Sequence, residues 1–431
     1  MTRFRGIGFA RHGGLWGLSA LLWLGSSCGD DGMMTPTTDS GSSGSSSSTG
    51  SSTTTSTSSS GPVDSSETVD PDTGPPPMTC GNGVVDVGEV CYFDGVDYVT
   101  GMVPSDVVLA DLQGDGFVDI VTADVGSDGH SILLGQGQGM FGPPIALPGG
   151  FGTRGIAAGF IDQDDIIDLA GANPGTNYVA VYYGDGTGQF TDQSPQAAGM
   201  GPRSVAVVDL DDDGWGDLLA VAELSEELVV RRGDGAGGFL PAEAYPVGAE
   251  PYDLVVVDLD DDADLDVAVV NQGEDTVSIL RGDGSGTFAP EQRETVGPGP
   301  RSVAAADMDD DGAIDLVTAN FDDDRIGLLR GDGNGGWRTL QAVPVGPEPY
   351  AVGLTDVTGD GMLEMAVVRR DTAELAIYSR AGGTLYQVVG VYQVPLNPLA
   401  IAVADLNDDT VPDFVIPAGG ANAVNVVLSF P

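Results

Sequence analysis

The stretch from Asp307 to Asp315 reads D-M-D-D-D-G-A-I-D and places carboxylates at its first, third, fifth and ninth positions. These side chains can converge on one point if the backbone curls, and Gly312 at the sixth position permits the positive φ that such a curl needs. Converging carboxylates repel one another unless a cation lies between them. An oxygen-only ligand set without a nearby His or Cys favours Ca²⁺ over a transition metal, and Mg²⁺ fits less well because it prefers a rigid octahedral shell.

The residues around this loop distinguish it from an EF-hand. An EF-hand loop begins with the same D-x-D-x-D-G pattern but carries a bidentate Glu at its twelfth position, where this sequence has Thr318. The flanking segments 303–308 and 314–319 are apolar and partly β-branched, which predicts strands and not helices. We therefore expect the loop to join two strands.

The acidic loop belongs to a repeat with a constant period of 49 residues. Its first positions are Asp111, Phe160, Asp209, Asp258, Asp307, Asp356 and Asp405. A Gly-Asp-Gly hairpin signal keeps the same step from Gly184 to Gly331, and an aromatic residue follows it. Within one unit, the expected strands are 205–210, 218–222, 228–232 and 239–245. Seven units of four short antiparallel strands predict an all-β, seven-bladed propeller.

The two ends of the repeat region complement each other. The last unit stops at Pro431, before its fourth strand, whereas residues 92–103 match a fourth strand that no first three strands precede. We expect this N-terminal strand to complete the C-terminal blade and close the ring without a free edge.

Three motifs recur in phase over residues 92–431: D-x-D-x-D-G-x-x-D-[LIV], then G-D-G-x-G-x-F, then V-G-x-x-P. This combination resembles the FG-GAP or VCBS repeat family. The resemblance implies a calcium-bearing β-propeller like the integrin α-subunit head and certain seven-bladed fungal lectins. It also implies that the calcium loops join the first and second strands of each blade.

The loops differ in their predicted ligands, and we expect four to six Ca²⁺ ions. The second loop has Phe160 at its first position, so its Asp162, Asp164 and Asp168 are not counted as a site, and Ala263 replaces the glycine of the fourth loop, which would cost affinity. The candidate metal ligands, loop by loop, are Asp111, Gln113, Asp115 and Asp119; Asp209, Asp211, Asp213 and Asp217; Asp258, Asp260, Asp262 and Asp266; Asp307, Asp309, Asp311 and Asp315; Asp356, Asp360 and Glu364; and Asp405, Asn407, Asp409 and Asp413.

The N-terminal 91 residues carry export and tethering signals. Residues 1–28 combine early Arg residues, an apolar run and small residues, and the sequence L-G-S-S-C at 24–28 resembles a bacterial lipoprotein signal in which Cys28 becomes lipidated. The alternative is secretion with ordinary cleavage. Residues 29–79 are rich in Ser, Thr, Gly and Pro and predict a disordered tether. We expect an exported protein that is lipid-anchored to the outer membrane or surface of a bacterium, or otherwise secreted.

A short motif at 80–91, C-G-N-G-V-V-D-V-G-E-V-C, resembles the opening of a disulfide repeat of bacterial surface proteins. If Cys28 carries lipid, Cys80 and Cys91 are the cysteines that remain in an exported chain, and a disulfide between them is the simplest expectation.

Charge limits the partners. Against 65 acidic residues the chain has 16 basic residues, all Arg, which gives a formal net charge of −49. Nucleic acid and anionic membrane surfaces are therefore poor partners, and contact with a membrane is expected through the lipid alone. We expect a monomer that binds an extracellular protein or glycan.

A candidate ligand face lies opposite the calcium loops. One residue after V-G-x-x-P, the repeat column contains Arg154, Arg203, Tyr252, Arg301 and Tyr350, which could ring the axial opening and meet a ligand. The alternative is that each Arg pairs with nearby acids such as those at 322–324.

Function follows from these features as an expectation. We expect a calcium-binding surface propeller that serves as a binding or adhesion module, with a lectin-like carbohydrate binder as the first alternative and an extracellular hydrolase or lyase as the second. Catalysis has little support, because His12 lies in the signal segment and His130 has no evident Ser or Cys partner. A glycosidase pair cannot be distinguished among carboxylates committed to metal.

Overall fold

The computed structural model describes residues 78–79, 91–162, 164–192, 195–382 and 385–430. The predicted signal segment with Cys28, most of the tether, and Cys80 lie outside the described residues. Among the residues that are described, no helix has the length and apolar character needed to cross a membrane.

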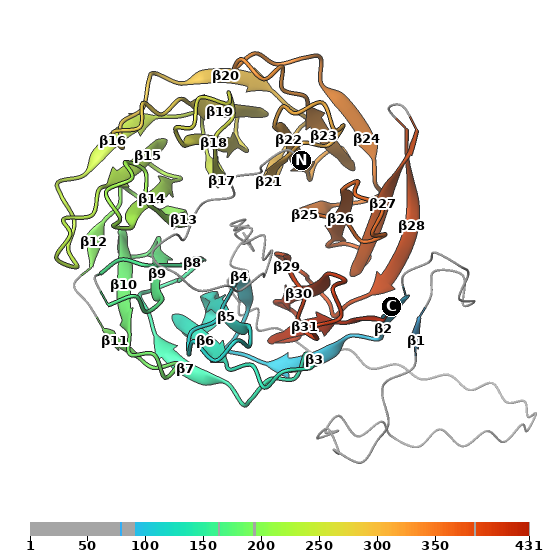
Figure 1. The fold of residues 1–431 in the computed structure, drawn as a ribbon, viewed down its shortest axis with the longest axis horizontal. Helices are drawn as coiled ribbons and strands as arrows, with labels where there is room; N and C mark the ends of the chain where they lie inside the picture. Colours follow the sequence, from blue (N-terminus) through green and yellow to red (C-terminus); the bar gives the residue numbers. More distant parts are fainter. Residues whose placement is uncertain (1–77, 80–90, 163, 193–194, 383–384, 431) are drawn as a thin grey trace, which may run out of the picture. The chain divides into compact units, whose positions relative to one another are not determined.

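Seven antiparallel sheets stand around a common axis and form a seven-bladed propeller, as the repeat predicted (Figure 1). In each blade the first strand lies nearest the axis and the fourth lies at the rim.

The first blade contains β4 (Pro104–Ala110), β5 (Asp119–Asp124), the 3-10 turn η1 (Val125–Ser127), β6 (Gly129–Leu133) and β7 (Ile145–Pro148). The second contains β8 (Gly155–Gly159), β9 (Asp168–Asn173), β10 (Tyr178–Gly184), β11 (Phe190–Asp192) and β12 (Gln196–Ala197). The third contains β13 (Pro202–Val208), β14 (Asp217–Ala222), β15 (Glu227–Arg231) and β16 (Glu243–Pro246). The fourth contains β17 (Pro251–Val257), β18 (Asp266–Asn271), β19 (Thr276–Leu280) and β20 (Gln292–Thr295).

The fifth blade contains β21 (Pro300–Ala306), β22 (Asp315–Asn320), β23 (Arg325–Leu329) and β24 (Gln341–Pro344). The sixth contains β25 (Pro349–Thr355), β26 (Glu364–Arg369), β27 (Glu374–Gly382) and β28 (Leu385–Gln393). The seventh contains β29 (Ala402–Ala404), β30 (Asp413–Ala418), β31 (Ala423–Val427) and, from the other end of the repeat region, β3 (Val96–Val99).

Ring closure follows the prediction. β3 pairs antiparallel with β31, from Val96 opposite Val426 to Val99 opposite Ala423, so an N-terminal strand supplies the rim of the last blade. A small sheet that the sequence did not suggest lies beside this seam, where β2 (Cys91–Phe93) pairs with β1 (Met78–Thr79) and β32 (Ser429–Phe430). Cys91 is disulfide-bonded, and because Cys80 is outside the described residues the pairing of the two stays a prediction.

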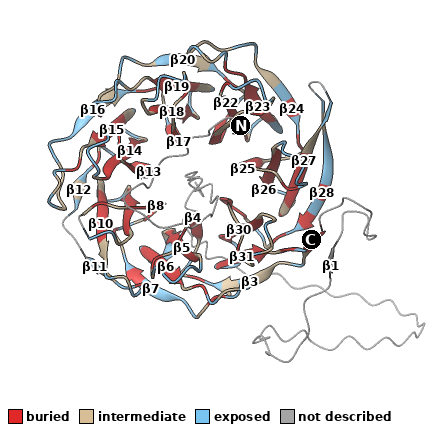
Figure 2. Cartoon of the chain, in the orientation of Figure 1, coloured by how far each residue is buried: buried red, intermediate tan, exposed pale blue. Residues whose placement is uncertain are grey.

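Burial explains why the strands take these places. Every residue of β13 is buried, whereas β16 is mostly exposed, and the same gradient from axis to rim recurs around the ring (Figure 2). Seven apolar clusters fill the space between blades, one for each of the seven interfaces between neighbouring blades. The cluster between the last and first blades includes Phe141 and Val426, so the closing interface is as apolar as the others.

Buried polar side chains also join neighbouring inner strands. The Ile156 amide donates to Asp106 Oδ2 at 2.9 Å, and the Val303 amide donates to Asp253 Oδ2 at 3.1 Å. Ser204 Oγ donates to the other oxygen of Asp253 at 3.1 Å. These bonds cross blade boundaries and fix the angle between adjacent sheets.

Strand ends differ in detail from the sequence-based expectation. In the third blade the expected rim strand at 239–245 narrows to Glu243–Pro246, with an isolated bridge between Gly233 and Phe239. Pro241, which cannot donate to a strand ladder, lies between the two.

Candidate functional site

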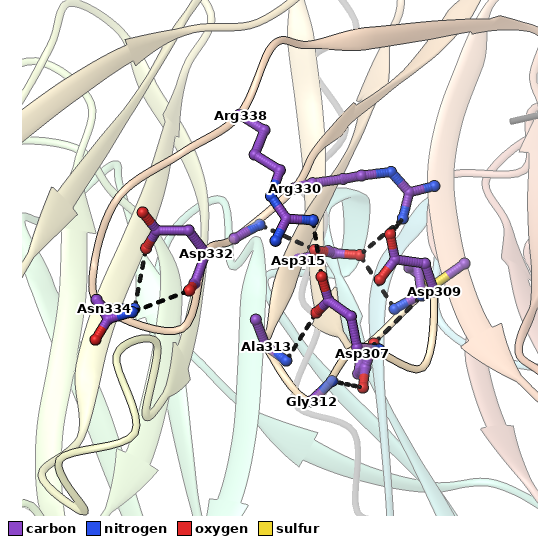
Figure 3. Close-up of polar contacts among 12 residues, drawn as sticks. Asp307, Asp309, Gly312, Ala313, Asp315, Arg330, Asp332, Asn334 and Arg338 are labelled. Atoms are coloured by element: carbon purple, nitrogen blue, oxygen red, sulfur yellow. Dashed lines mark hydrogen bonds and ion pairs between the residues drawn. The ribbon is translucent and has the colours of Figure 1, made fainter.

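Each acidic loop connects the end of an inner strand to the start of the second strand, as the repeat pattern indicated. In the fifth blade, Asp307 follows β21 directly and Asp315 is the first residue of β22 (Figure 3). Asp307 Oδ1 accepts a bond from the Asp311 amide at 3.2 Å, and its Oδ2 accepts one from the Gly312 amide at 2.8 Å. The first carboxylate therefore holds the turn in its curled form before any cation is considered.

The ninth carboxylate has a second, structural task that the sequence did not reveal. Asp315 Oδ2 accepts from the Met308 amide at 3.2 Å, while Oδ1 accepts from the Gly331 amide at 2.9 Å, so one side chain ties the acidic loop to the Gly-Asp-Gly hairpin. Five other blades repeat both bonds, through Asp119, Asp168, Asp217, Asp266 and Asp413. The signal for this role was present as a constant spacing of 16 residues between the acid and the hairpin residue.

Burial makes these ninth carboxyl groups hard to ionise. Desolvation raises the pKa of Asp315 to about 6 and that of Asp217 to about 7, despite the amide bonds that both accept. These raised pKa values show that burial disfavours the charged carboxylates, and a cation close to them would favour the charged form.

Three loops bring carboxylates together closely enough to share one ion. The clusters are Asp209 with Asp211 and Asp217, Asp258 with Asp260 and Asp262, and Asp307 with Asp309 and Asp311; within each cluster, one oxygen from every residue lies within 4.8 Å of the others. In all three clusters, one oxygen of the third-position aspartate lacks a hydrogen-bond donor. This oxygen is Oδ1 of Asp211, Asp260 and Asp309, which is buried and accepts no hydrogen bond from the described residues. These oxygens and their neighbours fit a hard divalent cation.

The remaining loops are less acidic. Gln113, Thr358 and Asn407 replace Asp at the third position, although Asp111, Asp356 and Asp405 still accept the two turn-forming amide bonds. In the second loop, Asp162, Asp164 and Asp168 do not form a cluster of this kind.

Arginines contact the three clustered loops, and sequence reasoning missed them. Arg330 Nη1 forms an ion pair with Asp309 and lies 3.4 Å from Asp315 Oδ2 (Figure 3). Arg281 Nη1 lies 2.9 Å from Asp260 Oδ2 and 3.2 Å from Asp266 Oδ2. Arg232 is more distant, at 4.0 Å from Asp211. Each of these arginines immediately precedes a Gly-Asp-Gly hairpin, which is the signal that could have identified them.

The candidate ligand face is a packed cluster of cations and rings at the opposite ends of the inner strands. The Arg203 guanidinium carbon lies 3.7 Å from the centre of the Tyr252 ring, and the Tyr252 and Tyr350 hydroxyls are 2.6 Å apart. Arg301 stacks on Phe321 at 3.8 Å. Arg203, Tyr252 and Tyr350 are each at most 1% exposed, Arg301 is buried, and Arg154 is half-buried.

The alternative of pairing with acids holds for part of this column. Arg203 Nη1 lies 2.6 Å from Glu223 Oε2, an acid outside the expected stretch 322–324. In Arg301, Nε and Nη1 are buried and make no hydrogen bond to the described residues, and the guanidinium lies against the rings of Phe321 and Tyr350.

His130 is buried against Tyr182, and burial lowers its pKa to about 4. A neutral imidazole that is 2% exposed is not placed to touch a substrate.

Comparison with known proteins agrees with the repeat geometry. The FG-GAP-like repeat family matches residues 161–220, 258–318 and 307–367, and the last two matches begin at first-position aspartates of the acidic loops. No curated protein sequence matches the chain significantly.

Solved structures share the fold at low sequence identity. BBS1N, crystallised in complex with ARL6DN, has a TM-score of 0.56 and 14% identity over 78% of this chain and 96% of that chain. Virginiamycin B lyase from Staphylococcus aureus has a TM-score of 0.52 and 11% identity over 78% and 98%. A lectin from Agrocybe aegerita follows with a TM-score of 0.49 and 16% identity over 77% and 86%. At these identities, the first two structures establish a shared fold alone. The chain therefore carries FG-GAP-like repeats within a seven-bladed β-propeller.

Proposed function

We propose that the protein is a calcium-stabilised propeller that serves as a binding or adhesion module at the cell surface. Two observations carry the calcium part: Oδ1 of Asp211, Asp260 and Asp309 is buried without a hydrogen-bond partner among the described residues, and each of these aspartates clusters with two other carboxylates of its loop. The FG-GAP repeat and the propeller fold support the binding part, because repeats of this family are typical of extracellular and surface proteins.

In the fifth loop, Asp307, Asp309, Asp311 and Asp315 would hold the ion, with equivalent residues in the third and fourth loops. Bound Ca²⁺ would supply positive charge where the carboxylates crowd. The chain's own groups already position the ligands, since amide bonds from Asp311 and Gly312 fix Asp307 and those from Met308 and Gly331 fix Asp315. Binding therefore needs little reorganisation of the loop.

The calcium proposal is tested by titrating the metal-free full-length protein with Ca²⁺ and with Mg²⁺ in a calorimeter. Asp309→Asn removes a carboxylate at the third position and should weaken or abolish binding at one site. Asp310→Asn is the matched control, because it makes the same chemical change at the neighbouring residue, whose side chain is exposed. Equal effects of the two substitutions, or no Ca²⁺ binding by the unsubstituted protein, would refute the assignment.

The structure favours binding over catalysis in one respect: His130 is buried beyond the reach of a substrate. A hydrolase or lyase would have to use carboxylates instead, and activity against polysaccharide and phosphoester panels would reveal it.

A lectin-like role is the second candidate for the ligand. It depends on the column of Arg154, Arg203, Tyr252, Arg301 and Tyr350, of which Arg154 is the most accessible. A glycan array that shows specific binding, lost in Arg154→Ala, would favour the lectin over a protein-binding adhesin. Binding to immobilised extracellular proteins without glycan binding would favour the adhesin.

Anchoring is part of the same proposal. Lipidation of Cys28 would tether the propeller to the outer membrane or cell surface through residues 29–79. Mass spectrometry of the N-terminal peptide from native membranes would show a diacylglyceryl adduct, and Cys28→Ser should release the protein into the medium.

A further inference from the structure

The arginine that precedes each Gly-Asp-Gly hairpin varies around the ring together with the third loop position. Arg232, Arg281 and Arg330 occur in the three loops that have Asp at both the first and third positions. At the same repeat position, the four other loops have Leu134, Tyr183, Ser379 and Leu428. In those loops either the third residue is uncharged or, in the second loop, the first residue is Phe160.

The formal charge at these repeat positions is the same in every loop. A loop with four ligand-position carboxylates and one arginine has a net charge of −3, and so does a loop with three carboxylates and no arginine. All seven loops reach this same value, counting the first, third, fifth and ninth positions and the residue before the hairpin. The arginine stands at this position in every loop that has the fourth carboxylate and in none of the others.

Contacts show that the compensation is direct in the fourth and fifth loops, whereas Arg232 in the third loop lies 4.0 Å from Asp211 and 3.5 Å from Glu243. Arg330 is 8% exposed, and its Nη1 contacts Asp309 at the third position and Asp315 at the ninth. Arg281 makes the same two contacts in the fourth loop. In each case one guanidinium nitrogen touches the carboxylate that gives the loop its additional charge. At such short separations the interaction is weakly screened by salt, unlike that of an exposed pair.

We infer that Arg232, Arg281 and Arg330 are built-in counter-ions that set the cation affinity of the third, fourth and fifth loops. Each offsets the additional third-position aspartate, so that the five counted positions have the same formal charge of −3 in every loop. The arginines act as positioning and affinity-determining residues and not as ligands. This inference rests on the proposed calcium binding, and it extends that proposal to residues outside the loop motif.

The chain itself supplies the template for the test. The first loop has Gln113 at the third position and Leu134 before the hairpin, so Asp309→Gln with Arg330→Leu converts the fifth loop to that natural combination. The wild type, both single variants and the double variant are compared by Ca²⁺ calorimetry and by thermal unfolding in EDTA. Arg338→Leu is the matched control, because Arg338 forms an ion pair with Asp311 of the same loop at 2.7 Å but is 52% exposed.

The expected results differ in sign for the two single changes. Arg330→Leu should tighten Ca²⁺ binding at one site by about tenfold and lower the melting temperature in EDTA, because carboxylates lose a buried counter-ion. Asp309→Gln should weaken binding at one site by about tenfold or more. The double variant should return to within about threefold of the wild type and melt above Arg330→Leu in EDTA. Arg338→Leu should change the affinity by less than about threefold.

Additive effects in the double variant, or an Arg330→Leu variant that matches wild type in both assays, would overturn the inference. If no loop of the wild type binds Ca²⁺, the proposed function fails, but the EDTA arm still decides the pairing. Mutual rescue of Asp309→Gln and Arg330→Leu in EDTA would then show charge compensation without metal, and a lack of rescue would refute it.

Discussion

Strain at the sixth loop position provides a quantitative test of the loop geometry. Four loops have glycine there, at φ of 89°, 89°, 88° and 86° for Gly116, Gly214, Gly312 and Gly361. The fourth and seventh loops have side chains at the same point, with Ala263 at φ 77° and Thr410 at φ 73°. A non-glycine residue in this region costs about 1–2 kcal/mol, and a glycine returns about 0.5–1 kcal/mol of that as unfolded-state entropy.

We therefore expect Ala263→Gly and Thr410→Gly each to raise the free energy of unfolding by about 0.5–1 kcal/mol, with the larger gain for the β-branched Thr410. Both side chains are exposed, so no packing is lost. The reverse change, Gly312→Ala, should cost a similar amount, and because a Cβ there would meet no atom within 4 Å, the cost isolates the backbone term.

Denaturant titrations in saturating Ca²⁺ and in EDTA measure these changes. The amides of Ala263 and Thr410 donate to the first-position aspartates and hold the turn, so the gain should appear in EDTA as well, and Ca²⁺ affinity should change little. The sequence predicted that Ala263, in place of the loop glycine, would lower Ca²⁺ affinity; a marked gain in affinity in Ala263→Gly would support that prediction. A gain confined to Ca²⁺ would show that the turn forms only on binding, and no gain in either condition would refute the strain argument.

Three other features give expected outcomes. Burial lowers the pKa of His130 to about 4 in the folded protein, from about 6.5 in the unfolded chain. The free energy of unfolding should therefore fall as the pH drops from about 6.5 toward 4, because the unfolded chain binds a proton that the folded protein does not. In His130→Leu, the fall in this free energy between pH 7 and pH 4.5, measured by denaturation, should be smaller by on the order of 3 kcal/mol. Tyr350→Phe leaves the Tyr252 hydroxyl buried without its partner at 2.6 Å and should lower the free energy of unfolding by about 1–3 kcal/mol. Adding Tyr252→Phe should recover most of this loss, whereas additive losses in the double variant would contradict the hydrogen bond. A reductant should destabilise the propeller by up to about 3 kcal/mol if Cys91 pairs with Cys80, and Cys91→Ser should abolish the effect of the reductant.

The repeat period made the fold predictable. A loop signal that returns every 49 residues determines the number of blades, and the unmatched strand near residue 96 determines how the ring closes. The small sheet of β1, β2 and β32 was not predictable, because its segments are two or three residues long and carry no periodicity.

Prediction of the site was less complete for a physical reason. The D-x-D-x-D-G pattern identifies ligand types, but not which other groups approach the carboxylates from elsewhere in the blade. Arg330 lies 21 residues after Asp309, and Gly331 donates to Asp315 across a hairpin, so both contacts depend on the register of three strands. The candidate ligand face was predicted to a similar extent. Its common column was visible in the sequence, whereas the stacking of Arg203 on Tyr252 and the contact between the Tyr252 and Tyr350 hydroxyls depend on how the inner strands of different blades are placed.

Thermal unfolding of the full-length protein in Ca²⁺, in Mg²⁺ and in EDTA tests the central claim most directly. Each occupied loop should contribute about 2.7 kcal/mol at a free Ca²⁺ concentration about 100 times its Kd, so even three loops would produce a large stabilisation. The account predicts a marked fall in melting temperature in EDTA that Ca²⁺ reverses and Mg²⁺ restores only weakly. Identical melting in all three solutions, from protein that retains no calcium on purification, would contradict it.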